Sequence, residues 1–160
     1  MSSLVEIERK FLLSGLPPTM RFARREPIRQ GYLALDGDTE VRVRVMPNAR
    51  TLTIKSGRGG VRVEEELALD ARQAESLWQL TEGRRVQKVR RRVRIGGATV
   101  EVDEYGGALD GLVVAEVEFD DEEASRSFEA PSWFAREVTD DPRYSNRSLA
   151  SEGLPEDVAG

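Results

Sequence analysis

Charged and apolar residues alternate along most of the chain, and this alternation constrains the fold more than any other feature. Residues 40–46 show it clearly, since Glu40, Arg42 and Arg44 alternate with three valines. Side chains of a β-strand point alternately to opposite faces, so such a strand has one charged face and one apolar face. The same alternation occurs in residues 5–11, 51–55, 61–67, 88–95, 100–105 and 113–119. We therefore predict a sheet with its charges gathered on one face.

The patterns predict eight strands and a few helices. The strands are expected at residues 3–12, 28–35, 40–46, 51–55, 61–69, 85–95, 99–105 and 112–119. A short helix or turn is expected within residues 16–26, and helices are expected at residues 70–82, 121–128 and 144–152. Asp70 is a suitable N-cap for the first of these three helices, and Gly83 follows its end. Trp133 and Phe134 are expected to pack against the sheet.

Eight antiparallel strands would curl, and closing the sheet would remove its exposed edges. We therefore predict an α+β, mainly β, fold: a closed eight-stranded antiparallel β-barrel tunnel with a charged interior and helices packed outside. The 160 residues suffice for one domain, which we place at residues 1–152. Residues 153–160 are expected to form a C-terminal tail that frays.

The composition excludes several classes of function. The chain has no cysteine and no histidine, so disulfides, cysteine nucleophiles, Ser-His triads and His-ligated zinc are impossible. The net charge is −5, whereas nucleic-acid binders are usually basic. No apolar run approaches the ~20 residues of a membrane span. We expect a cytoplasmic protein that binds neither nucleic acid nor membrane.

The charged face points to a ligand that carries both signs of charge. Carboxylate oxygens without histidine or cysteine suit Mg²⁺ or Mn²⁺ rather than zinc. Arginine and lysine suit phosphate oxygens. Only three lysines occur among the 24 basic residues, and all three lie in register with the charged residues of their strands. A complex of a polyphosphate with a divalent metal would satisfy both clusters.

The order of these motifs resembles the CYTH, or triphosphate tunnel metalloenzyme, family. The resemblance begins with the ExExK signature at residues 6–10 and spans roughly residues 3–150. It includes Arg42-Val43-Arg44, Thr53-Ile54-Lys55, residues 62–66, Lys88-Val89-Arg90, Glu101-Val102-Asp103, Glu116-Val117-Glu118 and residues 142–146. Residues 29–33 and 81–86 are most similar to those of short bacterial members, which are inorganic triphosphatases. One departure is the extra Arg91, which we expect to point outward.

The resemblance implies a tunnel, a divalent metal and a triphosphate-bearing small-molecule substrate, with a homodimer as one option. The implied metal ligands are Glu6, Glu8 and Glu118, with Glu116 and Asp103 nearby. The implied phosphate-binding residues are Lys10, Arg42, Arg44, Lys55, Arg62, Lys88, Arg90 and Arg143. Glu64 and Glu66 are candidates for a second metal site or for positioning the attacking water, and Lys88 for stabilising the leaving group. Residues 144–146 are expected to cap or plug one tunnel end, with Arg143 reaching inward.

The leading prediction is metal-dependent hydrolysis of inorganic tripolyphosphate. A class IV-type adenylyl cyclase or a thiamine triphosphatase is the alternative within the family. The cyclase branch tends to carry a His-Phe pair before ExExK, which this histidine-free chain lacks. A non-catalytic polyphosphate- or nucleotide-binding module is the alternative of another class. Such a module would need the basic residues but not every carboxylate, so the many glutamates favour catalysis. For Tyr32, a position facing the tunnel and burial against a helix are both compatible with the sequence.

Overall fold

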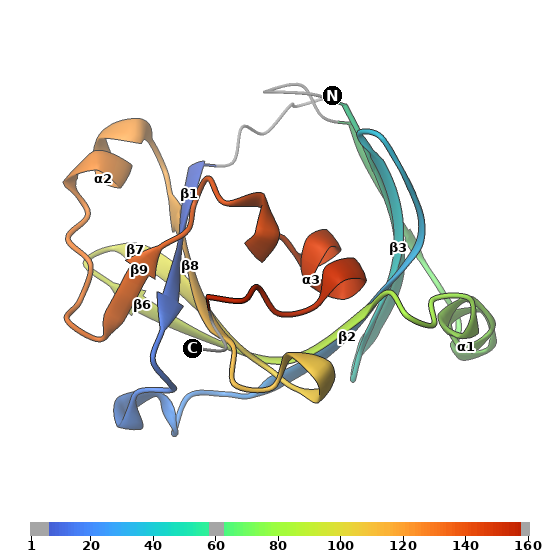
Figure 1. The fold of residues 1–160 in the computed structure, drawn as a ribbon, viewed down its shortest axis with the longest axis horizontal. Coiled ribbons are helices and arrows are strands. Elements are labelled where there is room, and N and C mark those ends of the chain that lie inside the picture. The colour runs from blue at the N-terminus through green and yellow to red at the C-terminus, as the bar shows by residue number, and fades with distance from the viewer. Residues whose placement is uncertain (1–6, 58–62, 158–160) are drawn as a thin grey trace.

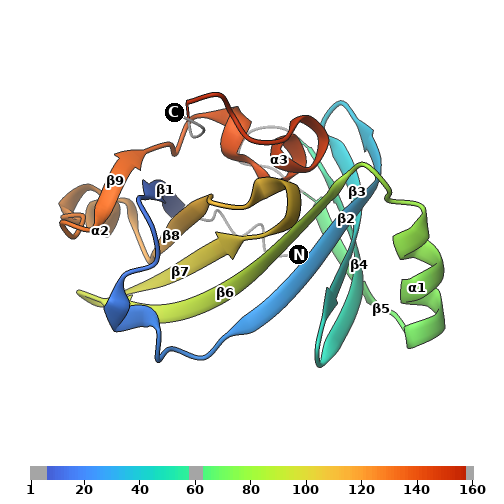
Figure 2. The same cartoon turned by 60° about the horizontal axis from the view of Figure 1, so that its bottom comes forward.

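The computed structural model describes residues 7–57 and 63–157, which form a strongly curved antiparallel sheet (Figure 1). The sheet order is β5-β4-β3-β2-β6-β7-β8-β1-β9, and the long strands β2 and β6 lie side by side at its middle (Figure 2). The strands are β1 (Ile7–Leu13), β2 (Glu26–Asp36), β3 (Thr39–Met46), β4 (Ala49–Ser56), β5 (Val63–Ala68), β6 (Arg85–Ile95), β7 (Ala98–Tyr105), β8 (Val113–Phe119) and β9 (Phe134–Glu137).

Within residues 7–57 and 63–157, six short helical segments connect or cover these strands. The α-helices are α1 (Ala71–Gln79), α2 (Glu122–Ser127) and α3 (Asn146–Glu152). The 3₁₀ segments are η1 (Pro18–Met20), η2 (Gly107–Leu109) and η3 (Pro142–Tyr144). Asp70 caps α1 as predicted, because its carboxylate accepts from the amide of Gln73 while the Gln73 side chain accepts from the amide of Asp70. Helix α1 is shorter than predicted and ends before Thr81.

The mainly β, antiparallel character is confirmed, and all eight predicted strands are present within the described residues. The prediction of eight strands was nevertheless wrong, because β9 adds a ninth beside β1. Strands β5 and β9 are the two edges of the sheet, and closure into a barrel is not shown by the described residues. Residues 1–6 and 58–62, which adjoin β1 and β5 in the sequence, lie outside the described part of the chain.

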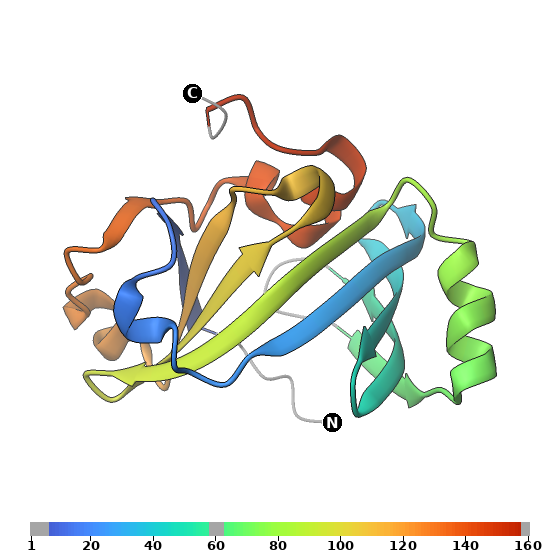
Figure 3. The ribbon, with the colours of Figure 1, turned by 90° about the horizontal axis from the view of Figure 1, so that it is seen from below.

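The outer face of the sheet carries the main apolar core. Phe11 and Leu13 of β1 pack there with Val100 and Val102 of β7 and with their neighbours on β8. Aromatic rings from β9 and the region of α2 extend this core, since the ring centroids of Phe11 and Phe134 are 4.9 Å apart. Helices α1 and α2 lie on this outer side, as predicted (Figures 1 and 3).

The prediction that all helices pack outside was wrong for α3, which lies within the concave side of the sheet (Figure 1). Leu149 and Ala150 of α3 are buried in a second apolar cluster with Val86, Leu112 and Val114. This cluster occupies one end of the inner face, where the strands carry apolar rather than charged residues. An apolar platform inside the curve therefore gives α3 a place to pack.

Close packing of the turn that follows α1 against β2 explains two sequence motifs. A methyl group on Gly31 would lie 2.6 Å from Cβ of the buried Thr81, so only glycine allows this approach. The Thr81 hydroxyl donates to the carbonyl of Trp78 and accepts from Nε of Arg85, at 2.6 and 2.9 Å. The guanidinium of Arg85 also lies over the Trp78 ring. These contacts fix the end of α1 on the middle of the sheet.

The beginning of the tail is held in place rather than frayed, at least to residue 157. The carboxylate of Asp157 accepts from the Tyr144 hydroxyl at 2.8 Å and pairs with Arg136 and Arg143. Glycine 153 turns the chain after α3 with a positive φ of 82°. Among the described helices, none is long and apolar enough to cross a membrane.

Candidate active site

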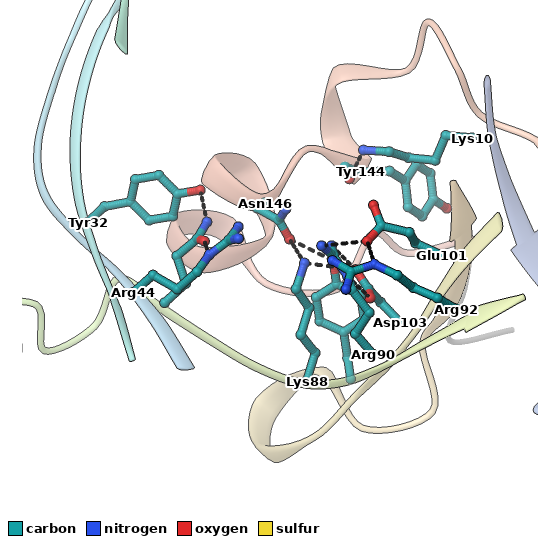
Figure 4. A network of polar contacts seen from close by, with 12 residues as sticks. Lys10, Tyr32, Arg44, Lys88, Arg90, Arg92, Glu101, Asp103, Tyr144 and Asn146 are labelled. Atoms are coloured by element: carbon teal, nitrogen blue, oxygen red, sulfur yellow. Dashed lines mark hydrogen bonds and ion pairs between the residues drawn. The ribbon is translucent and has the colours of Figure 1, made fainter. Parts of the chain in front are cut away.

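Cross-strand pairs of opposite charge occupy the centre of the inner face (Figure 4). In the register of β6 and β7, Arg90 lies opposite Asp103, and Arg92 lies opposite Glu101. Nε and Nη2 of Arg90 donate to the two oxygens of Asp103 at 2.8 and 2.9 Å. The Lys88 ammonium is 2.8 Å from Oδ2 of the same carboxylate. One buried aspartate therefore holds two buried cations.

The pKa values of this cluster reflect burial and crowding of like charges. Burial lowers the pKa of Lys88 to about 8, with Arg90 and Arg44 adding to the effect and Asp103 opposing it. Burial opposes ionisation of Asp103 as well, but Lys88 and Arg90 together lower its pKa to about 2. Asp103 is thus anionic at neutral pH, while the Lys88 ammonium is close to its titration range.

A second basic group lies across the curve on β2 and β3. Tyr32 pairs with Arg42, and Gln30 pairs with Arg44, in the register of these strands. Nε of Arg44 donates to Gln30 at 2.8 Å, and Gln30 donates to the Tyr32 hydroxyl at 2.9 Å. Tyr32 is both on the inner face and buried against the apolar cluster that includes α3, so both sequence expectations apply to it.

Arg42 and Arg44 on the inner face are only partly stabilised by the described residues. Burial lowers the pKa of Arg44, and the charges of Arg42 and Arg90 lower it further. Nε of Arg42 is buried and has no hydrogen-bond partner among the described residues. An unpaired buried donor on a guanidinium costs free energy that an anionic ligand would recover. This surface is therefore suited to a polyanion.

Carboxylates of β1 and β8 adjoin this basic surface. Glu8 lies opposite Glu118, and Lys10 lies opposite Glu116, in the register of the two strands. Burial opposes ionisation of Glu116, but a hydrogen bond with Glu8 and the charges of Lys10, Lys88 and Arg90 hold its pKa below the ordinary value. The Lys10 ammonium also donates to the carbonyl of Tyr144 at 3.2 Å.

These carboxylates fit a divalent cation in chemistry. Glu8, Glu116 and Glu118 are oxygen donors on adjacent strands, and the first two already lie within hydrogen-bond contact of each other. In residues 7–57 and 63–157, no three acidic side chains are arranged closely enough to hold a metal as they stand. The predicted ligand Glu6 and the predicted phosphate contact Arg62 lie outside the described residues.

The structure places the remaining predicted residues as follows. Lys55 and Glu64 face each other on β4 and β5 with a separation of 3.8 Å, and Glu66 is on the same face opposite Thr53. Asp103 has both oxygens engaged by Lys88 and Arg90, so the structure favours an orienting role over the predicted metal ligation.

Arg91 points to the outer face as predicted, where it is buried and lies 3.3 Å from Glu104.

The prediction that Arg143 reaches inward to contact phosphate is not tested by the structure, which shows this arginine held by two carboxylates. Its side chain is 48% exposed and pairs with Asp141 at 2.6 Å and with Asp157 at 3.1 Å. The residue that enters the inner face from this motif is Asn146, which accepts hydrogen bonds from Lys88 and Tyr105. The sequence pointed to this motif but not to the ion pairs of Arg143. Asp141 is two residues away in the sequence, whereas Asp157 is 14 residues away.

Sequence reasoning also missed Gln30 and the contact of Tyr105 with α3. Gln30 is fully buried and links Arg44 to Tyr32. A signal for it existed, because Gln30 and Tyr32 share a strand face and are two residues apart. The partner of Tyr105 is 41 residues away in the sequence, so no local pattern could identify it.

Comparisons with known proteins agree with this geometry. A family model described as the CYTH domain matches residues 4–152. An inorganic triphosphatase of Nitrosomonas europaea is 43% identical over 149 residues, covering 92% of this chain and 97% of that protein. An inorganic triphosphatase of Acetivibrio thermocellus is 42% identical, covering 90% of this chain and 92% of the relative. The crystal structure of the inorganic triphosphatase NE1496 superposes with a TM-score of 0.78 at 40% identity, covering 95% of this chain and 97% of that one.

Proposed function

The chain belongs to the CYTH domain family, and from this premise we propose that it hydrolyses inorganic tripolyphosphate with the help of a divalent cation. Both curated relatives are named inorganic triphosphatases, and each is more than 40% identical over nearly its whole length. The observation in this chain that carries the proposal is a crowded group of cations, with Nε of Arg42 unpartnered among the described residues, beside adjacent carboxylates on one concave face.

The proposed phosphate contacts come from both sides of the curve. Arg42 and Arg44 of β3 and Lys55 of β4 would bind the chain from one side, with Arg62 as a further candidate. Lys10, Lys88 and Arg90 would bind it from the other side. Guanidinium and ammonium donors stabilise phosphate oxygens, and more strongly where charge accumulates in the transition state. Arg143 is not part of this proposal, because it is paired elsewhere.

The proposed cation ligands are Glu8, Glu116 and Glu118, together with Glu6. Mg²⁺ and Mn²⁺ both suit such an oxygen-only set. When bound, the cation would draw charge from the phosphate oxygens and orient the chain. Asp103 keeps Lys88 and Arg90 charged and aligned rather than binding the metal.

In the proposed reaction, water attacks the terminal phosphorus and the bond to the bridging oxygen breaks, giving phosphate and diphosphate. Glu64 or Glu66 would position the water and take its proton, as the chain contains no histidine to do so. Lys88 would stabilise the charge that develops on the diphosphate leaving group.

We further propose that the curved sheet acts as a charged tunnel, with β5 and β1 facing each other across the substrate. Support comes from the inner-face register, which places basic residues on both halves of the sheet. A homodimer and a cytoplasmic location stay predictions from the sequence.

The test is release of phosphate from tripolyphosphate, ATP, thiamine triphosphate and diphosphate with Mg²⁺ or Mn²⁺, with Glu8→Gln as the control. Turnover of tripolyphosphate that is lost with EDTA and in Glu8→Gln is the expected result. Preference for thiamine triphosphate, or formation of cyclic AMP from ATP, would assign the site to another activity of the family. Binding of tripolyphosphate without release from any substrate would leave a binding module.

A further inference from the structure

Helix α3 contacts the candidate active site through the polar side chain of Asn146 (Figure 4). Asn146 is the first residue of α3, after the N-cap Ser145. Its Oδ1 accepts a hydrogen bond from the Tyr105 hydroxyl at 2.6 Å and another from the Lys88 ammonium at 3.4 Å. One amide oxygen thus joins α3 to β6 and β7 at the centre of the inner face.

Tyr105 determines which end of the Asn146 amide faces Lys88. The tyrosine is buried, and burial raises the pKa of its hydroxyl well above the ordinary value. The hydroxyl therefore keeps its proton and donates it, which requires an oxygen rather than an NH₂ group opposite. With Oδ1 held by Tyr105, the same oxygen faces the ammonium of Lys88.

Lys88 has three N–H donors, and two of them have oxygen partners among the described residues. One points to Asp103 at 2.8 Å and one to Asn146 at 3.4 Å. The Lys88 side chain is fully buried, and its ammonium lies over the Tyr105 ring at 5.4 Å from the centroid. The acceptors on Asp103 and Asn146, together with the Tyr105 ring, restrict the flexible Lys88 side chain to a single orientation. The third N–H is then available for a phosphate oxygen.

We infer that Asn146, oriented by Tyr105, is a positioning residue that aims the Lys88 ammonium at the leaving group. The inference rests on the proposed function, because it concerns the same lysine. Asp103 neutralises the Lys88 ammonium and orients one of its N–H bonds. Asn146 orients a second N–H bond without adding a negative charge next to the bound polyphosphate. A neutral acceptor orients the ammonium without competing with the substrate for its charge.

The first test is steady-state hydrolysis of tripolyphosphate by Asn146→Ala, Tyr105→Phe and the double variant. Asn146→Ala is expected to lower kcat about tenfold, with little change in KM, because one hydrogen bond to a charged group is lost. Tyr105→Phe is expected to lower kcat about threefold in the same way. The kcat of the double variant should match that of Asn146→Ala, because Tyr105 acts on Lys88 only through Asn146. Ser151→Ala, at an exposed residue of the same helix, is the matched control and should behave as wild type.

A conservative variant separates positioning from mere support of α3. Asn146→Asp keeps an acceptor oxygen of the same shape, so kcat should remain near the wild-type value. Its added charge would repel tripolyphosphate and raise KM instead. The inference would be overturned if Asn146→Asp lost as much kcat as Asn146→Ala. It would also be overturned if the double variant lost kcat by the product of the two single losses.

A second readout does not depend on activity. With lysine labelled at ¹³Cε, the chain gives three signals, and Lys88→Arg identifies the one from Lys88. Asn146→Ala and Tyr105→Phe should move the Lys88 signal in the free protein, and Ser151→Ala should not. An unmoved signal overturns the positioning role, even if the wild type hydrolyses tripolyphosphate. A moved signal in a wild type that releases no phosphate overturns the proposed function and leaves the orientation of Lys88 by Asn146 standing.

Discussion

The two faces of the sheet are built from alternate residues of the same strands but behave in opposite ways. On the outer face, Val100, Val102 and Val117 are buried in a continuous apolar core. On the inner face, their neighbours Glu101, Asp103 and Glu116 lie among arginines and lysines. The outer face stabilises the fold through burial of apolar area. The inner face keeps buried charges that lower the stability of the fold unless a ligand neutralises them.

The difference is visible in the pKa values of the inner face. Burial lowers the pKa of both Lys88 and Arg44, so each cation is held at a cost in free energy. Asp103 differs, because its two cationic partners lower its pKa and it therefore stabilises the cluster; the lowered pKa of Glu116 and the raised pKa of Arg90 have the same stabilising sign. The comparison predicts that substitutions on the outer face act on stability, and that most substitutions on the inner face act on activity.

The largest effect is expected where the inner face does contribute to stability. Asp103→Asn removes the anion that Lys88 and Arg90 share and leaves Arg90 with Glu101 at 3.1 Å, which should lower the free energy of unfolding by about 3 to 5 kcal/mol. Denaturation by urea, followed by circular dichroism, measures it. A loss below about 1 kcal/mol would be typical of an exposed pair and would contradict the assignment of Asp103 as the anchor of the cluster.

The next effect should separate the two faces cleanly. Lys88→Met is expected to lower kcat/KM about 10²- to 10³-fold, as for loss of one transition-state donor, without lowering the melting temperature. On the outer face, Val117→Ala should lower the free energy of unfolding by about 2 kcal/mol and keep kcat. Phosphate release and thermal unfolding of both variants test this. A Lys88→Met protein that unfolds as easily as Val117→Ala would break the comparison.

A smaller effect is expected where α1 contacts the sheet. Gly31→Ala would force its methyl group into Thr81, so the free energy of unfolding should fall by about 1 to 3 kcal/mol through overpacking. Gly15→Ala is the matched control, because no atom lies within 4 Å of the added carbon and its φ is not in the left-handed region. Equal stability of the two variants would show that α1 is not fixed at Gly31.

The smallest effect should appear in acid. The pKa of Asp103 is about 2 in the folded protein and 3.8 in the reference state, so the unfolded chain takes up its proton first as the pH falls. The stabilisation from this carboxylate is therefore complete above about pH 4 and is lost between about pH 4 and pH 2, amounting to about 2 kcal/mol. The stability difference between wild type and Asp103→Asn should narrow over this range. A constant difference would mean that the lowered pKa is not the source of the stability.

Much of this molecule could be predicted from local patterns. Alternation identified most of the strands and the charged face, because side-chain direction in a strand depends only on position parity. It placed Glu8, Lys10, Lys88 and Arg90 on one face, as the register confirms. It also placed Arg91 on the opposite face, although its ion pair with Glu104 required the structure.

The errors concern features that depend on contacts between distant segments. Strand β9 has four residues and only one buried side chain, so it carries no alternation to detect. The position of α3 inside the curve depends on an apolar platform assembled from β6, β8 and η2. The ion pairs of Arg143 with Asp141 and Asp157 likewise required the structure, while its predicted phosphate contact stays a prediction.

The most direct test of the central claim follows from the placement of the lysines. All three lysines of the chain, Lys10, Lys55 and Lys88, lie on the inner face, on β1, β4 and β6. The measurement is a titration of ¹³Cε-lysine-labelled protein with tripolyphosphate in EDTA, and again with Mg²⁺. Saturable shifts of all three signals at the same ligand concentration are predicted, because one chain would contact both halves of the sheet. Three unshifted signals, with binding still detected by calorimetry, would place the polyphosphate elsewhere and contradict the account.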